Sequence, residues 1–163
     1  MRTAFTIMAL LVVSAGGVAA ADPIYIDQLM EMPLTTLQQQ FPKLRNEGCY
    51  HIAPDRYLWI QMEKKDRKPW RVAITSIAPC KRPEEGPLLD VRERQGVELG
   101  VRTREVLEKM GRPDASAPPE ADFKKLGETE YVYMCRVSEG CARHTSIFMR
   151  DGYVTAISNW YSE

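Results

Sequence analysis

The sequence has no excess of charge of either sign. Lysine plus arginine number 22, and aspartate plus glutamate also number 22. A chain without net charge generates no long-range field that would attract nucleic acid or an anionic membrane surface. We therefore expect no nucleic-acid partner, and we expect any partner to be recognised by a local surface.

Sequence motifs typical of catalysis are also missing. The chain has two histidines, His51 and His144, and it contains no Gly-x-Ser-x-Gly elbow, phosphate-binding loop or metal-ligand helix. We therefore expect that the protein is not an enzyme and that it needs no cofactor. A small hydrolase or metal-binding enzyme that uses one of the two histidines is the less favoured alternative.

Long apolar runs are confined to the N-terminus. Residues 7–13 are apolar, Arg2 precedes them, and three alanines follow at 19–21. This order is typical of a secretory signal peptide, which we assign to residues 1–21 with cleavage before Asp22. The run is too short to cross a bilayer comfortably, and no cysteine follows the cleavage site to carry a lipid. We expect a periplasmic or secreted protein without a stable membrane anchor.

All four cysteines lie after this segment, at Cys49, Cys80, Cys135 and Cys141. An even number of cysteines in an exported protein favours disulfides over free thiols. Their order and spacing favour the pairs Cys49–Cys80 and Cys135–Cys141, because a short turn separates the last two. The two other ways of pairing four cysteines stay open.

A zinc site is the alternative to disulfides for two of the cysteines. Cys49 and His51 are two positions apart, and Cys141 and His144 are three apart, so together they provide four ligands of suitable chemistry. The alternation of strand residues would have to direct all four groups to one point in an oxidising compartment. We therefore expect no bound metal.

The clearest secondary-structure signal lies in residues 96–114, which predict one short helix. Thr103 is a suitable N-cap, Val106 begins an apolar stripe, and Gly111 followed by Pro113 ends the helix. A second short helix is predicted over residues 34–42, and residues 24–32 fit either a strand or a helix. Alternating apolar and polar residues predict strands at 49–52, 55–62, 70–77, 88–94, 129–137, 143–150 and 153–161, with 70–77 presenting one solvent-exposed face. Residues 114–122 show no periodicity and predict an exposed loop.

The two halves of the chain follow the same order of elements. Each runs from a helix through a strand and a turn to a final strand, and residues 70–77 are similar to 152–159. We predict an α+β fold of two tandem units, each a short helix packed on a three- to four-stranded antiparallel sheet. The expected division is a first unit over 22–80, a linker over 81–87 and a second unit over 88–163.

The stretch that contains Gly100, Thr103, Val106, Gly111 and Pro113 resembles a known helix signature. It is similar to that of the SmpA/OmlA family of small outer-membrane-assembly lipoproteins and of the β-lactamase inhibitor protein. The resemblance implies a helix against a curved antiparallel sheet, in two tandem copies, and a role in binding protein rather than in catalysis.

Aromatic residues are dense along the predicted strands. We expect some of them to be exposed and to bind a protein partner, and the candidates are Trp59, Trp70, Trp160 and Tyr161. The basic segment 64–71 fits a solvated hairpin tip better than an anion site. We expect a non-enzymatic binding module, an inhibitor or immunity protein acting on an envelope enzyme; the alternative is a soluble accessory to cell-envelope assembly.

Overall fold

The computed structural model describes residues 22–135 and 143–161. The predicted signal peptide and Cys141 therefore lie outside the described residues. Within them the protein has a mixed α+β fold in which strands predominate. No helix in these two ranges is long and apolar enough to cross a membrane.

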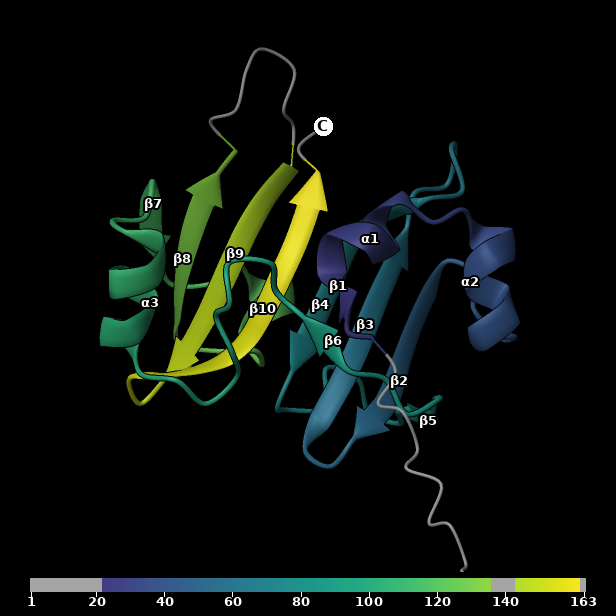
Figure 1. Ribbon diagram of the computed structural model, residues 1–163, viewed down its shortest axis with the longest axis horizontal. Helices are drawn as coiled ribbons and strands as arrows, with labels where there is room; N and C mark the ends of the chain where they lie inside the picture. The colour runs from purple at the N-terminus through teal and green to yellow at the C-terminus, as the bar shows by residue number, and fades with distance from the viewer. Residues whose placement is uncertain (1–21, 136–142, 162–163) are drawn as a thin grey trace, which may run out of the picture.

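Eight strands form one sheet that contains elements from both halves of the chain (Figure 1). Neighbouring strands are antiparallel, except that β5 runs parallel to β2. In sheet order the strands are β5 (Glu84–Glu85), β2 (Glu47–Ala53), β3 (Arg56–Met62), β4 (Pro69–Thr75), β10 (Tyr153–Tyr161), β9 (Arg143–Arg150), β8 (Thr129–Met134) and β7 (Ala115–Ala117). The pairing of β4 with β10 joins the two halves, and the predicted linker 81–87 contributes β5.

Three α-helices lie on one face of this sheet: α1 (Ile26–Glu31), α2 (Leu34–Gln40) and α3 (Thr103–Met110) (Figure 1). The ambiguous segment 24–32 contains both elements, because β1 (Ile24–Tyr25) precedes α1. β1 pairs in parallel with β6 (Val91–Arg92), a shorter strand than the predicted 88–94. The helices bury Leu29, Leu37 and Val106 against the sheet.

Strand alternation explains which side chains meet the helices. Leu58, Ile60, Val72, Ile74 and Ile157 point to the helix-covered face and are at most 2% exposed. Side chains two residues apart lie on the same face of a strand, so this core is built by the period-two pattern in the sequence. We call this side of the sheet the helix face, and the other side the second face.

The second face is only partly covered. The segment around the 3₁₀ helix η1 (Ala121–Phe123) lays Phe123 and Leu126 against Trp59 and Phe148, in a cluster that also contains the disulfide residues 49 and 80. Our prediction that 114–122 is an exposed loop is right about the exposure of most of its residues and wrong about the absence of regular structure. β7 forms there through backbone hydrogen bonds to β8, which require no apolar periodicity, and η1 turns an apolar side chain inward.

The start of α3 differs from the prediction by one residue. Arg102 is the N-cap, and its backbone N–H donates to Glu105 Oε1 at 3.2 Å. The hydroxyl of Thr103 instead donates to the carbonyl of Gly152 at 3.0 Å, which ties the helix to the turn between β9 and β10. Gly111 ends the helix as predicted, with a φ of 76° that favours glycine.

The predicted pair Cys49–Cys80 is confirmed, with a Cα–Cα distance of 6.4 Å. Cys135 is also disulfide-bonded, and its predicted partner Cys141 lies outside the described residues. The Cys49–Cys80 bond ties β2 to the segment that follows β4.

Replacing both Cys49 and Cys80 by alanine should lower the free energy of unfolding by about 3–4 kcal/mol. A disulfide restricts the unfolded chain, and this one spans a sequence separation of 31 residues. Urea denaturation followed by circular dichroism measures the change, with Leu88→Lys, at an 86% exposed position, as the unaffected control. A loss below about 1 kcal/mol would contradict the expectation.

Candidate functional site

A row of five side chains crosses the uncovered part of the second face. Gln61, Arg71, Trp160, His144 and Met134 come from β3, β4, β10, β9 and β8, which are consecutive strands in the sheet. Each is the direct register partner of the next. Because directly opposed residues of antiparallel strands point to the same face, the register alone brings these side chains side by side. We call this set the Arg71 row.

A groove of about 940 Å³ lies along this row. Arg71, Trp160 and Met134 of the row line it, whereas Gln61 and His144 do not. The other residues that line it include the aromatic residues Trp70, Phe123 and Tyr161 and the charged residues Glu63, Lys64, Glu120 and Glu130. The groove therefore combines aromatic walls with charged groups of both signs.

Arg71 has the most unusual environment in the groove. Only 6% of the residue is exposed, although it carries a guanidinium group. The guanidinium carbon lies 3.9 Å from the ring centre of Phe123, 5.0 Å from that of Trp70 and 5.4 Å from that of Trp160. Burial lowers the pKa of Arg71 to about 10, against the opposing attraction of Glu130 and Glu120. The group still carries its full charge at neutral pH.

The hydrogen-bonding groups of Arg71 are largely unused. Its Nε and Nη1 atoms are buried and have no hydrogen-bond partner. An unpaired donor removed from water costs about 1–3 kcal/mol, and more on a charged group. Buried charges in proteins are normally paired, so Arg71 is an exception whose free donors have capacity for a further acceptor.

Other unpaired atoms lie on the same face. Gln61 Oε1, His144 Nδ1 and Ser158 Oγ are also buried without hydrogen-bond partners. The ring of His144 lies 4.5 Å from that of Trp160, whose Nε1 donates to Ser146 Oγ at 2.8 Å. Unsatisfied polar groups of the described residues therefore gather along and beside the Arg71 row, although only Arg71 among them lines the groove.

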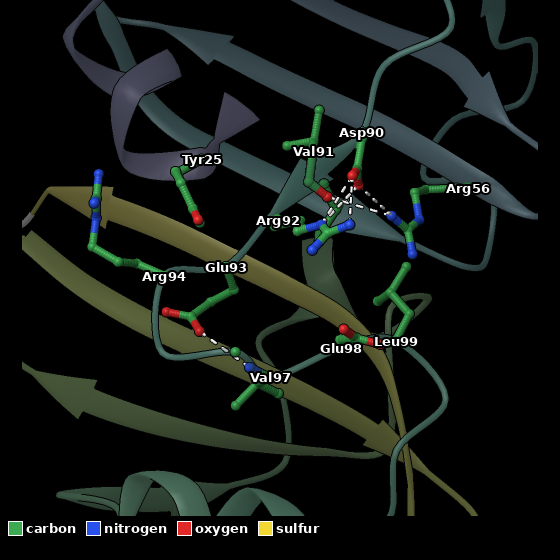
Figure 2. Close-up of a pocket in the computed structure, with 12 residues that line it drawn as sticks. Tyr25, Arg56, Asp90, Val91, Arg92, Glu93, Arg94, Val97, Glu98 and Leu99 are labelled. Carbon is green, nitrogen blue, oxygen red and sulfur yellow. Dashed lines mark hydrogen bonds and ion pairs between the residues drawn. The ribbon is translucent and has the colours of Figure 1, made fainter. Parts of the chain in front are cut away.

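A second, smaller cavity of about 230 Å³ lies beside β6 and carries more charged groups (Figure 2). Three of its charged side chains pair within the cavity: Arg92 Nη2 lies 2.7 Å from Asp90 Oδ2, and Arg56 Nη1 lies 3.7 Å from Asp90 Oδ1. Glu93 accepts a hydrogen bond from the N–H of Val97 at 3.3 Å. Because these groups already satisfy one another, we assign them a structural role and place the candidate site at the groove.

Three of the four predicted partner-binding residues line the groove: Trp70, Trp160 and Tyr161. Trp59 lies elsewhere, 3% exposed under the η1 segment, where its Nε1 donates to Glu47 Oε1 at 2.5 Å. The Tyr161 hydroxyl is hydrogen-bonded to Glu31 of α1, and burial followed by this bond raises its pKa to about 12. Tyr161 therefore links the groove to the helix face.

Sequence reasoning missed Arg71 as a site residue. Arg71 is the last residue of the basic segment 64–71, and it lies between the apolar residues Trp70 and Val72. This alternation predicted that its side chain lies on the solvent-exposed face of the strand. That expectation is wrong, since Arg71, Ala73 and Thr75 are at most 6% exposed. The only available signal was the adjacency of an arginine and Trp70 within a strand.

The residues of the zinc alternative that the structure describes, Cys49, His51 and His144, do not come together, and Cys141 lies outside the described residues. Cys49 is bonded to Cys80, and His51 lies on β2, four strands away from His144 on β9. Four strand spacings amount to about 19 Å. His51 Nδ1 instead lies 3.3 Å from Glu85 Oε2. Within residues 22–135 and 143–161, no group of three or more His, Cys, Asp or Glu side chains could hold a metal ion.

Replacing Arg71 by methionine should raise the free energy of unfolding at pH 7 by about 1 kcal/mol. The lowered pKa means that burial of the charged guanidinium costs about 3 kcal/mol of folding free energy. Each of the three contacts with aromatic rings offsets about 0.5–1 kcal/mol of this cost. Methionine keeps the apolar stem without the charge. Urea denaturation of both proteins measures the difference, and a clear loss of stability would mean that Arg71 serves the fold.

Replacing Glu93 by glutamine should stabilise the protein more at pH 8 than at pH 4. Burial raises the pKa of Glu93, although backbone hydrogen bonds oppose this. The folded protein therefore retains a proton that the unfolded chain loses, and wild-type stability falls as pH rises through the folded pKa. Glutamine keeps an acceptor for Val97 and has no such loss. Unfolding curves at the two pH values provide the test; an equal effect at both would contradict it.

Comparison with known proteins leaves the chain without an assigned family. No family model matches the sequence, and no curated protein matches it. The chain is similar to the solved structure of a DUF4309 family protein, YjgB from Bacillus subtilis subsp. subtilis str. 168. The two share 14% sequence identity and a TM-score of 0.45, over 72% of this chain and 66% of that chain. The chain thus spans slightly less than two thirds of that protein, and similarity at this level assigns neither a family nor a function.

Proposed function

We propose that the protein is an exported, non-enzymatic module that binds a segment of another protein in the groove along the Arg71 row. The observation that supports this most directly is the buried arginine with unpaired donors, surrounded by Trp70, Trp160 and Phe123. Arginine and tryptophan are the residues most enriched at the energetic centres of protein interfaces. A groove of about 940 Å³ has room for a few side chains of a partner.

The partner that we propose is an enzyme of the cell envelope, such as a toxin or a cell-wall hydrolase. In this proposal the chain acts as its inhibitor or immunity protein, as the resemblance to the β-lactamase inhibitor protein implies. A periplasmic or secreted location is consistent with the Cys49–Cys80 disulfide, because disulfides persist in oxidising compartments. The resemblance to SmpA/OmlA proteins supports envelope assembly as the alternative setting for the same binding groove.

We also propose that the single sheet arose from two tandem units, divided at residues 81–87. Three strands lie on each side of the β4–β10 pair, and each half supplies at least one helix to the same face. The Arg71 row crosses this boundary, with β3 and β4 on one side and β10, β9 and β8 on the other. Binding sites commonly form where two units meet, which agrees with the position of the groove.

A lysine at Met134 should weaken partner binding by about tenfold or more. Met134 lines the groove and is 52% exposed, so the substitution removes apolar contact and adds charge without disturbing the core. Leu88→Lys is the matched control, because Leu88 is exposed but absent from the groove lining.

The three proteins are immobilised and exposed to an envelope extract of the producing cells, and the bound proteins are quantified by mass spectrometry. We expect one stoichiometric partner that wild type and Leu88→Lys retain and Met134→Lys loses. Titration of the purified partner then gives the affinities, and an enzyme partner is assayed for inhibition. Equal retention by all three proteins would place binding outside the groove.

A further inference from the structure

We infer that Arg71 is the receptor for a single carboxylate of the bound protein segment, an aspartate or glutamate side chain that enters the groove. This inference rests on the proposed function and specifies its chemistry. Only 6% of Arg71 is exposed, and its Nε and Nη1 atoms have no hydrogen-bond partner. A carboxylate is the acceptor whose planar geometry and charge match a guanidinium group.

The surroundings of Arg71 hold it ready for such a ligand. The ring of Phe123 lies 3.9 Å from the guanidinium carbon, and Trp70 and Trp160 lie close by. These rings restrict the side chain and displace water, but they accept no conventional hydrogen bond. Most of the desolvation of the cation is therefore present before the partner arrives, so that less of the free energy of the new charge-assisted hydrogen bonds is lost on binding.

The charge of the groove favours one carboxylate over a phosphate group. Glu63, Glu120 and Glu130 line it together with only Lys64 and Arg71, and Glu120 and Glu130 lie close enough to attract Arg71 through space. A phosphate group with nearly two negative charges would be repelled by these carboxylates more strongly than a single carboxylate. The apolar lining from Phe123 and Trp160 also suits the methylene groups of an amino-acid side chain.

Gln61 offers a way to block the receptor from within. It lies directly opposite Arg71 in the register of β3 and β4, and its Oε1 atom is buried without a partner. Replacing Gln61 by glutamate would present an internal carboxylate to Arg71 with almost no change in volume. Gln61→Glu should therefore exclude an acidic ligand, whereas Gln61→Met removes the amide without supplying a competitor.

The probe is a display library of short random peptides, selected on immobilised wild-type protein with Leu88→Lys as a second bait. We expect selected peptides to share an aspartate or glutamate at one position. Replacing that residue by its amide should weaken binding to wild type about 10- to 100-fold, as measured by titration calorimetry. The same replacement should have almost no effect on binding to Arg71→Met, and Gln61→Glu should bind the acidic peptide as weakly as Arg71→Met does.

Each other outcome would overturn either the carboxylate receptor or the proposed function. Peptides that bind through the groove, as judged by their loss on Met134→Lys, but carry no shared acidic residue would overturn the carboxylate receptor and leave the proposed function standing. If replacing the acidic residue of the peptide still weakens binding to Arg71→Met, another cation binds the carboxylate, which would also overturn the carboxylate receptor. Recovery of no groove-dependent peptide would overturn the proposed function itself. Thermal unfolding of Arg71→Met and Gln61→Glu establishes beforehand that both variants are folded.

Discussion

The antiparallel pairing of β4 with β10 is the interaction on which the rest of the structure depends. It joins strands that lie more than half the chain apart and makes one eight-stranded sheet from both halves. Its register also sets Trp160 beside Arg71, and the register of β10 with β9 then sets His144 beside Trp160. A shift by one residue would turn all these side chains to the other face. The groove is thus a consequence of the same hydrogen bonds that build the sheet.

The two faces of the sheet are covered to different extents. Three helices fill the helix face, and α1 reaches the central strands through Leu29 and Met30. The η1 segment covers only part of the second face, and it ends beside Arg71 by placing Phe123 over the guanidinium. This partial cover removes Arg71 from water without supplying an acceptor. The groove at which we propose that a partner binds therefore lies where the cover of the second face is incomplete.

The contrast between the two charged regions supports this assignment of roles. Around β6, Asp90 pairs with Arg92 and Arg56, and Asp27 pairs with Arg94 at 2.6 Å. Among these ion pairs, Arg56–Asp90 links the start of β3 to the residue before β6, and Arg94–Asp27 links α1 to the segment after β6. Arg71 is more deeply buried than any residue of these ion pairs, yet its Nε and Nη1 atoms have no hydrogen-bond partner. Functional sites commonly retain such locally unfavourable arrangements, because the missing interaction is supplied by the ligand.

Much of the local structure was determined by the sequence itself. The bounds of β9 and β10, the end of α3 at Gly111 and the Cys49–Cys80 pair follow from alternation, helix-ending residues and spacing, all of which act between near neighbours or along one strand. Three of the four aromatic candidates also proved to line one groove. Only the tertiary structure decided that both halves share one sheet, that Trp59 is covered and that Arg71 is buried. Those outcomes depend on strand register and on where the η1 segment settles, and such long-range packing leaves no periodic signal in the chain.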